Sequence, residues 1–501
     1  MKKVFVTVGS TDSGSSKTAA KGAQKSPSSV KTGKSKKSRG LKIAGAIAGV
    51  LAIAAGGGVA VVVNNNRQIV VDAPPAVSHV SAPVTAAQSS LDDGALAQKV
   101  SAIMDAAAAD PAFGELHGIV SDATTGQKLW GINDTALAMP ASSMKILTAS
   151  AALLDLGEDH RVSTRVSRVT GTNDIVLHGG GDPTLSKDGE GFFQDSASIA
   201  ELAKKISVVI PEGVGKVYLD NSLFTESFHE TWEREGLEDG YIAPVESVMM
   251  DAGRIDPTNE ESQRSATPAA DAADALAKAL GAENGGSLRD ASKDGQSLPL
   301  DPDPVALVQS APLVTRVHEM MNYSDNVLAE SIAREVAISR GLPPTFQGAA
   351  RAVRDTLAEH GFPLNGAVLS DSSGLSTDNR ISPQHLSEVL NSAAGPVESA
   401  EPGGLAESQE SSESTALRLR PLLDSLPVAA VSGTLATRFA GQSGAGIVRA
   451  KTGTLNKASA LAGYVVTKSG QVLTFALISN EASLLPARAA SDKAASALAD
   501  I

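Results

Sequence analysis

An uninterrupted apolar run at residues 43–63 divides the chain into two parts that cannot share one fold. The run, IAGAIAGVLAIAAGGGVAVVV, holds 21 residues and no charged or strongly polar side chain. As a helix rising about 1.5 Å per residue it would extend roughly 30 Å, the thickness of the hydrocarbon core of a bilayer. We therefore predict a transmembrane anchor at 43–63, which separates a short N-terminal tail from a long C-terminal body.

Charge sets the orientation of this anchor. Residues 1–42 carry eleven Lys or Arg and a single acid, Asp12, for a charge of about +10, whereas Arg67 is the only base close to the other end of the run. Because basic flanks stay in the cytoplasm, we predict a disordered cytoplasmic tail at 1–42, a single pass through the cell membrane and an extracytoplasmic body. A cleaved signal peptide is the alternative, but its leader and apolar region are usually shorter.

The body is acidic. The whole chain has a net charge of -13, so the residues after the tail sum to about -23. An acidic surface repels phosphate backbones, and we predict no nucleic-acid partner. The chain has no cysteine, and its eight histidines show no metal-binding spacing such as H-E-x-x-H. These features exclude a thiolate metal site and argue against a zinc enzyme.

The body begins after a Pro/Ala/Ser-rich stretch at 64–90, which we predict to be a flexible linker. The segment 91–160 predicts a helix, a β-hairpin and a second, largely apolar helix that starts near Pro140. Residues 161–299 are strand-like in pieces and are predicted to form an inserted β-rich lobe. Residues 300–501 predict helices, then three strand runs joined by short polar turns, and a last helix.

The order of these elements predicts the fold class. The hairpin near the start and the antiparallel strands near the end would form one sheet from both ends of the chain, so 91–160 and 300–501 would belong to one domain. We predict an α+β fold in which an antiparallel sheet is flanked by helices. The acidic, Gly/Ser-rich segment 394–416 is predicted to be a mobile excursion that carries no chemistry.

A serine three residues before a lysine occurs twice, in SSVK at 28–31 and in SSMK at 142–145. The first copy lies in the polar tail, which cannot hold two side chains in fixed geometry. The second lies at the start of the apolar helix, where residues three apart share a face. There Ser142 would be a nucleophile near a helix N-terminus, and Lys145 would be its base once burial or a second cation lowers its pKa. Taken alone, the pattern also fits a helix-start serine and a solvated lysine.

The tetrapeptide YSDN at 323–326 is predicted at a junction between helices. Ser324 supplies a second hydroxyl that could relay a proton to a leaving group, and Asn326 supplies an amide that could hold a substrate backbone. An ordinary Asx-type turn is the other interpretation.

The stretch KTGT at 451–454 is predicted on a strand. Gly453 would let another chain approach closely, so an extended peptide could add alongside as an extra strand. Lys451 would be the second cation, and with the hydroxyls of Thr452 and Thr454 it would face a substrate carboxylate. The alternative is a sheet strand with one exposed lysine.

The three motifs together are far more specific than any one of them, and in this order they resemble the signature of penicillin-binding proteins and serine β-lactamases. The chain from about residue 93 onward resembles more closely the D-alanyl-D-alanine carboxypeptidase/endopeptidase family, the class C, type-4 low-molecular-mass penicillin-binding proteins. The resemblance rests on the stretches PASSMK, LHGGGDPTL, YIAPVESVMMD, SAPLVTRVHEMMNYSDNVLAE, LSDSSGLSTDNRISP, LPVAAVSGTLATRF and VRAKTGTL.

This resemblance implies a three-layer β-lactamase/transpeptidase-like fold with an all-helical subdomain. It implies a serine D,D-peptidase that cleaves terminal D-Ala-D-Ala bonds, and sometimes crosslinks, of peptidoglycan stem peptides through an acyl-enzyme, with β-lactam antibiotics as inhibitors. The implied catalytic residues are Ser142, Lys145 and Ser324, with backbone N–H groups of Ser142 and Thr454 as the oxyanion hole. The implied substrate-binding residues are Asn326, Lys451, Thr452, Gly453 and Thr454. The resemblance implies no metal and no cofactor.

Two features depart from the family pattern. Ser142 and Ser324 are 182 residues apart, which leaves room for an inserted lobe, but for a shorter one than the family leads us to expect. The stretch DSSGLST carries Ser372 and Thr377 where D-G-S-G-L-S-R is usual, and the resemblance places this loop at the border of the site.

Two other functions stay open at this point. A serine β-lactamase-like hydrolase would need a base that hydrolyses its acyl-enzyme, often the glutamate of E-x-x-L-N, and no such sequence follows Asn326. A catalytically inactive peptidoglycan-binding protein would have lost a motif residue, and none is missing.

Overall fold

The computed structural model of the chain describes residues 62–63, 69–70, 93–288, 298–396 and 407–501, in two units that span 1–84 and 85–501. In the first unit, the short strands β1 (Val62–Val63) and β2 (Ile69–Val70) pair in antiparallel orientation. None of the helices in the described ranges combines the length and the apolar character that a bilayer crossing needs. The predicted tail and, apart from the two residues of β1, the predicted anchor lie outside the described residues.

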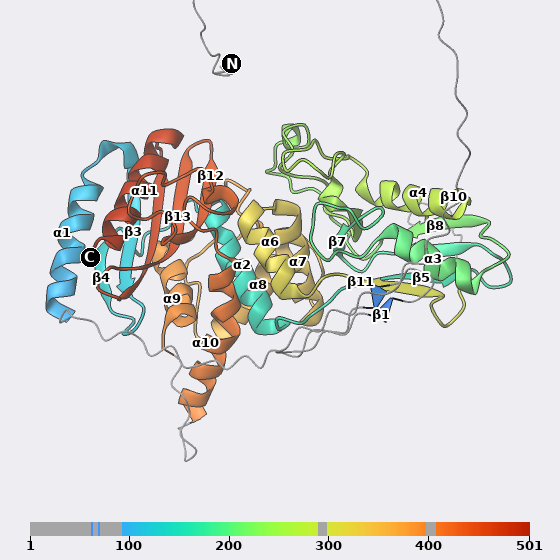
Figure 1. The fold of residues 1–501 in the computed structure, drawn as a ribbon, viewed down its shortest axis with the longest axis horizontal. Coiled ribbons are helices and arrows are strands. Elements are labelled where there is room, and N and C mark those ends of the chain that lie inside the picture. The colour runs from blue at the N-terminus through green and yellow to red at the C-terminus, as the bar shows by residue number, and fades with distance from the viewer. Residues whose placement is uncertain (1–61, 64–68, 71–92, 289–297, 397–406) are drawn as a thin grey trace, which may run out of the picture. The chain divides into compact units, whose positions relative to one another are not determined.

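A five-stranded antiparallel sheet is built from both ends of the second unit (Figure 1). Its order is β12-β13-β14-β3-β4, and β3 pairs with β14 so that Val120 lies opposite Phe475. The predicted sheet from two distant parts of the chain is therefore confirmed. The strands are β3 (Glu115–Asp122), β4 (Lys128–Ile132), β12 (Arg449–Leu455), β13 (Ala458–Val466) and β14 (Val472–Asn480).

Helices cover both faces of this sheet (Figure 1). On one face lie α1 (Asp93–Ala108) and α11 (Leu484–Ala499), and on the other lies α9 (Pro383–Ala394). Successive side chains of a strand point to opposite faces, and along β3 Ile119 joins the core under α9 while Val120 joins the core under α1 and α11. The resulting helix–sheet–helix layers confirm the α+β fold class.

The helical half of the domain surrounds α2 (Lys145–Asp155). Every residue of α2 from Lys145 to Leu154 is buried. A helix that is enclosed on all sides carries its first residue into the protein interior, which removes Lys145 from water. The helices packed around it are α6 (Leu313–Tyr323), α7 (Asn326–Ser339), α8 (Phe346–Glu359) and α10 (Glu407–Ser425).

The prediction of a mobile excursion at 394–416 is wrong from Glu407 onward, where α10 begins; residues 397–406 lie outside the described residues. Leu419 and Leu422 of α10 are fully buried, and the helix packs against α9, α2 and α6. The acidic composition of the segment masked the helix because the leucines that anchor it follow residue 416.

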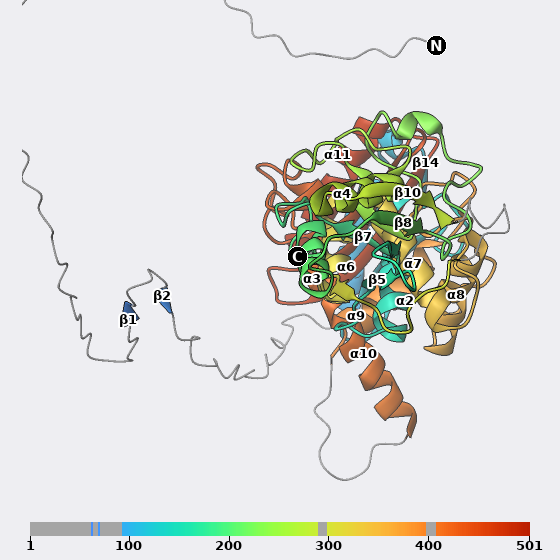
Figure 2. The same ribbon diagram turned by 90° about the vertical axis from the view of Figure 1, so that its right-hand side faces the viewer.

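The inserted lobe, which faces the viewer in Figure 2, holds a second sheet of order β10-β8-β6-β5-β11. Its strands β6, β8 and β10 are parallel, and helices α3 and α4 lie between them in the chain, so the β-rich lobe also contains helices. Strand β11 lies beyond the predicted boundary at 299 but pairs with β5, so that boundary divides the sheet. The elements are β5 (Ser163–Arg168), β6 (Ile175–His178), α3 (Ile199–Val209), β8 (Lys216–Asp220), α4 (Pro268–Leu280), β10 (Glu283–Ser287) and β11 (Ala306–Gln309), with a separate parallel pair β7 (Asp182–Leu185) and β9 (Val248–Met250).

Candidate active site

The S-x-x-K motif lies on a tight turn that leads into α2. Residues Ala141–Met144 form a 3-10 helix, in which side chains three apart are eclipsed, so Ser142 and Lys145 stand on one side. Ala141 has a φ of 48°, a left-handed conformation that costs a non-glycine residue about 1–2 kcal/mol. Gly374 makes room for this turn, because a Cβ atom at Gly374 would collide with the Ala141 carbonyl oxygen. The surroundings therefore fix the backbone that carries the Ser142 hydroxyl.

The Lys145 amine is surrounded by three oxygens. Its Nζ donates to Ser142 Oγ at 3.0 Å, to Asn326 Oδ1 at 2.6 Å and to the Ser373 carbonyl oxygen at 2.7 Å. The amide oxygen and the carbonyl oxygen can only accept hydrogen bonds. A neutral amine keeps two N–H groups for them, which leaves its lone pair directed at Ser142 Oγ.

The protonation of Lys145 follows from its environment. Burial lowers the pKa of Lys145 to about 8, although the negative charges of Asp371, Glu330 and Asp325 oppose this shift. A lysine with an ordinary pKa would be almost entirely charged at neutral pH and could not take a proton. The site therefore keeps a usable fraction of this amine neutral.

The second and third motifs meet beside this pair. Ser324 joins α6 to α7 in a left-handed conformation, and its Oγ accepts a hydrogen bond from Lys451 Nζ at 2.8 Å. Lys451 is fully buried and also donates to the Thr452 carbonyl oxygen at 2.9 Å. Burial, followed by repulsion from Lys145, holds the pKa of Lys451 well below its usual value. Lys145 thus disfavours protonation of Lys451.

Strand β12, which carries KTGT, is an edge strand of the main sheet. Gly453 faces the nucleophile turn, because a Cβ atom there would lie 2.7 Å from the Pro140 carbonyl oxygen. An edge strand offers unpaired backbone groups to an extended peptide. A side chain at Gly453 would push that edge away from Ser142.

Hydrogen bonds between side chains join five of the eight predicted site residues in two groups, Ser142 with Lys145 and Asn326, and Ser324 with Lys451. The side chains of Thr452 and Thr454 form hydrogen bonds with residues outside this predicted set. Thr452 Oγ1 bonds to Thr434 Oγ1 at 2.8 Å, and Thr454 Oγ1 accepts from Arg488 Nη2 at 2.7 Å.

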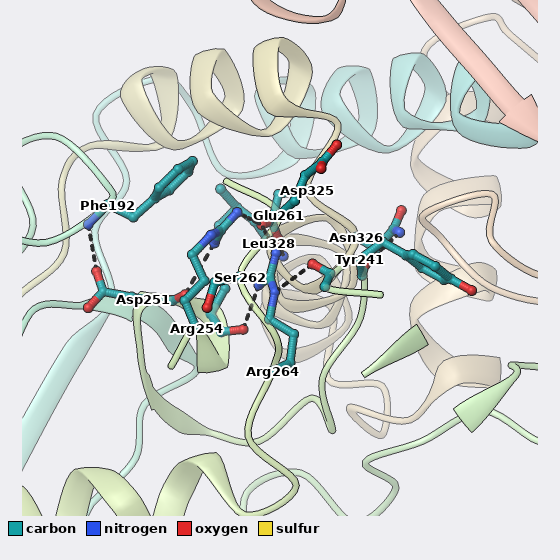
Figure 3. Close-up of polar contacts among 12 residues, drawn as sticks. Phe192, Tyr241, Asp251, Arg254, Glu261, Ser262, Arg264, Asp325, Asn326 and Leu328 are labelled. Carbon is teal, nitrogen blue, oxygen red and sulfur yellow. Dashed lines mark hydrogen bonds and ion pairs between the residues drawn. The ribbon is translucent and has the colours of Figure 1, made fainter. Parts of the chain in front are cut away.

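The inserted lobe holds the second motif through buried charges (Figure 3). Asp325 Oδ2 lies 2.9 Å from Arg254 Nη2 and 3.4 Å from Arg264 Nη2, and none of the three side chains is more than 3% exposed. Burial would raise the pKa of Asp325, but the two guanidinium groups outweigh it and hold the pKa at about 2. Asn326 Nδ2 donates to the Tyr241 carbonyl oxygen at 2.9 Å, so the lobe fixes both residues after Ser324.

Sequence reasoning missed the carboxyl groups beside Lys145. Glu330 is fully buried on α7, and its Oε1 accepts from the backbone N–H groups of Ser372 and Ser373 at 3.0 and 2.7 Å. Burial, followed by repulsion from Asp371, raises the pKa of Glu330 to about 7. The available signal was an acid four residues after Asn326, in the mainly apolar stretch VLAESIA of α7. Glu330 fixes the loop whose Ser373 carbonyl orients Lys145. Across the part of the chain that the structure describes, no group of His, Cys, Asp and Glu could hold a metal ion.

Comparison with known proteins agrees with this geometry. The model of the D-Ala-D-Ala carboxypeptidase 3 (S13) family matches residues 100–265 and 257–500. A carboxypeptidase of Mycobacterium tuberculosis is 44% identical over 397 residues, which cover 76% of this chain and 80% of the relative. The carboxypeptidase DacB of Mycolicibacterium smegmatis is 44% identical over 389 residues, which cover 75% and 79%. The crystal structure of penicillin binding protein 4 from Haemophilus influenzae shares the fold, with a TM-score of 0.60, 21% identity, and coverage of 79% of this chain and 97% of that one. The chain belongs to the D-Ala-D-Ala carboxypeptidase 3 (S13) family.

Proposed function

We propose that this protein is a serine D,D-peptidase that hydrolyses the terminal D-Ala-D-Ala bond of peptidoglycan stem peptides through an acyl-enzyme on Ser142. Membership of the family and the names of the carboxypeptidase relatives support this function. The observation that carries it is the 3.0 Å contact between Ser142 Oγ and the buried Lys145 Nζ. This contact gives a hydroxyl the neighbouring base that it needs to become a nucleophile.

Acylation begins at the hydroxyl of Ser142. The neutral amine of Lys145 takes the hydroxyl proton while Oγ attacks the carbonyl carbon of the penultimate D-alanine. The two oxygens that orient the amine also stabilise the ammonium that forms, because each accepts one of its N–H groups. Backbone N–H groups of Ser142 and Thr454 are the proposed donors to the oxyanion.

Expulsion of the terminal D-alanine needs a proton on its nitrogen. Ser324, whose Oγ is held by Lys451, donates that proton as the C–N bond breaks, and the proton gained by Lys145 restores the Ser324 hydroxyl. A water molecule then attacks the acyl-enzyme and gives one proton to Lys145, which passes that proton to Ser142 Oγ as the ester bond breaks. No net proton is gained or lost by the protein.

Asn326 has a different proposed role from the one suggested by its motif. Both ends of its amide are engaged, since Oδ1 accepts from Lys145 and Nδ2 donates to the Tyr241 carbonyl oxygen. These contacts support a role in positioning Lys145. The edge position of β12 in the sheet supports the binding of the peptide substrate, with Lys451, Thr452, Gly453 and Thr454 along it.

Labelling with fluorescent penicillin tests this proposal. β-Lactam recognition is supported by the fold shared with penicillin binding protein 4 from Haemophilus influenzae, which has been crystallised in complex with a novel β-lactam. We expect stable labelling of the full chain and none of Ser142→Ala, and mass spectrometry of digested muropeptides should show loss of one D-alanine. Rapid release of the label would indicate a β-lactamase instead, and an unlabelled wild-type protein would contradict both enzyme functions.

The structure offers the β-lactamase alternative little support. Glu330 is the carboxyl group that α7 places near Lys145, and it is fully buried. Its Oε1 is already engaged by two backbone N–H groups. A glutamate held in this way is poorly placed to activate a water molecule for rapid deacylation.

We also propose that residues 43–63 anchor the protein in the cell membrane, with the N-terminus in the cytoplasm and the catalytic unit on the cell-wall side. The length of the apolar run and the charge of about +10 on residues 1–42 support this arrangement. Membrane fractionation and protease treatment of spheroplasts test it. We expect the protein to resist extraction by salt and its catalytic unit to be digested from outside; release by salt would contradict the anchor.

A further inference from the structure

A cavity separate from the active site lies beyond the carboxyl ends of the parallel strands β6 and β8. It has a volume of about 570 Å³, and none of the eight predicted site residues, all within the described part of the chain, lines it. His178 and Asp220, the last residues of the two strands, lie on its wall, and the end of α7 contributes to the wall as well. Sheets with parallel strands commonly bind ligands beyond the carboxyl ends of those strands, and the volume suits a small molecule.

Three side chains from neighbouring strands form a row across this end of the sheet. Arg165 of β5 lies directly opposite His178 of β6, and His178 lies opposite Asp220 of β8. Opposite residues of an antiparallel pair point to the same face of the sheet, with Cβ atoms about 5 Å apart. All three residues line the cavity. The row therefore offers a guanidinium, an imidazole and a carboxylate to one ligand.

The hydrogen bonds of this row leave one ring nitrogen unpaired. His178 Nδ1 lies 3.0 Å from Asp220 Oδ2. The hydrogen bond with His178 lowers the pKa of Asp220, so this carboxylate stays charged and can only accept. Nδ1 therefore carries the hydrogen, and Nε2 of the neutral ring is left as an acceptor. Nε2 is buried, and no described residue forms a hydrogen bond with it. A ligand with an N–H group would supply the missing donor.

The arginine end of the row carries positive charge that no carboxylate balances. Arg165 is exposed, and within the described residues its guanidinium forms no hydrogen bond and no ion pair. Arg161, which also lines the cavity, donates to the Ser310 carbonyl oxygen at 2.7 Å and likewise has no carboxylate partner among the described residues. The acid Glu335 on the wall is already bound by two nitrogens of Arg316, at 2.5 and 2.9 Å. This excess of positive charge favours an anionic ligand.

We infer that this cavity binds a ligand with the chemistry of an amino acid, whose α-carboxylate contacts Arg165 and whose N–H group donates to His178 Nε2. Because the two side chains are direct neighbours, the ligand must carry its anion and its donor close together. The α-carboxylate and the α-nitrogen of an amino acid share one carbon atom and meet this condition. Aliphatic residues of the wall, among them Leu156, Val162 and Leu223, would contact an aliphatic side chain of the ligand.

Isothermal titration calorimetry of the full chain with N-acetylleucine and with N-acetylleucinamide tests both contacts. Both probes carry the N–H group, but only the acid carries the charge that Arg165 would bind. Hydrogen bonds to charged groups predict that the acid binds about tenfold to a hundredfold more tightly than the amide. Free leucine is the third probe. Tighter binding of leucine than of N-acetylleucine would identify a free amino acid as the ligand, and the reverse order would identify an acylated one.

Variants locate the binding in the cavity. Arg165→Gln should abolish the preference for the acid, leave the affinity for the amide unchanged, and be labelled by penicillin like the wild type. Arg351→Gln, which removes an exposed arginine of α8, is the matched control and should keep the preference. His178→Phe keeps an aromatic ring but loses the acceptor, and it should weaken both probes by about twofold to tenfold.

Equal binding of acid and amide by the wild type would overturn the inference, and so would the absence of binding by all three probes. An unchanged preference in Arg165→Gln would do the same. A wild-type protein that binds the acid but is not labelled by penicillin would contradict the proposed function and leave this inference standing.

Discussion

Replacing Asp325 by Asn removes the carboxylate that two buried arginines share and changes little else. Arg254 and Arg264 contact Asp325 Oδ2, whereas Oδ1 accepts from the Leu328 backbone N–H at 2.9 Å and caps α7. Asparagine has a similar volume and is as good a helix N-cap as aspartate. Asp325→Asn therefore isolates the loss of charge from the loss of the cap.

The expected cost follows from burial. With the carboxylate gone, both guanidinium groups stay in an interior where their side chains are 1% and 3% exposed. Removing one partner of a buried ion pair costs about 3–5 kcal/mol because the remaining charge is uncompensated. A typical domain has only about 5–15 kcal/mol of stability, so Asp325→Asn should lose a large fraction of the free energy of unfolding.

Urea titrations of the full chain at neutral pH, followed by tryptophan fluorescence, measure this loss. The pKa of Asp325 is held at about 2 in the folded protein, below its value of about 3.9 in an unfolded chain. The carboxylate therefore contributes its full stability above about pH 4, and this contribution disappears as the pH falls through about 2. The difference between wild type and variant should shrink over that range.

Asp303→Asn, which changes an exposed aspartate in the same way, is the control and should have almost no effect. A loss below about 1 kcal/mol in Asp325→Asn would refute the reasoning, because removing one partner of a buried ion pair should lower the free energy of unfolding by more than that. A loss equal to that of the control would do the same.

Three further outcomes test the site. The rate of acylation by penicillin should rise as the pH increases through about 8, since Lys145 acts as a base only when neutral, and a flat profile there would contradict its role. Gly374→Ala should lower the free energy of unfolding by about 1–3 kcal/mol more than Gly366→Ala, and it should also weaken penicillin labelling. Both glycines have positive φ, but only at Gly374 would the added methyl group collide with Ala141. Equal losses would argue against that crowding. Glu330→Gln should shift the acylation profile to lower pH, since the negative charge of Glu330 raises the pKa of Lys145; an unchanged profile would show that the two groups are uncoupled.

Local patterns made the sheet and the nucleophile turn predictable. Strands β12 to β14 are strand-like runs joined by short polar turns, and their pairing needs only neighbouring segments. Ser142 and Lys145 are three residues apart, so the first turn of any helix brings them together. At Ser324 the sequence predicted a junction between two helices but not its left-handed conformation, because that conformation depends on the residues that pack around it.

Partners that lie far apart in the chain escaped prediction. Arg254 and Arg264 precede Asp325 by 71 and 61 residues, and nothing in their local sequence marks them as its counter-ions. Arg488 follows Thr454 by 34 residues and belongs to α11, whose sequence predicts only a helix. Such contacts are set by tertiary packing, whereas single-sequence patterns report only on neighbours along the chain.

These distant contacts change how the inserted lobe should be viewed. Each of the three residues SDN is held by charged partners: Ser324 by Lys451, Asp325 by two arginines, and Asn326 by Lys145. The arginines and the Tyr241 carbonyl that binds Asn326 all come from the lobe. Because a catalytic geometry must be held to within a fraction of an ångström, a lobe that supplies these contacts acts as part of the active site. We therefore expect changes at 241–264 to lower acylation through their contacts with Asp325 and Asn326.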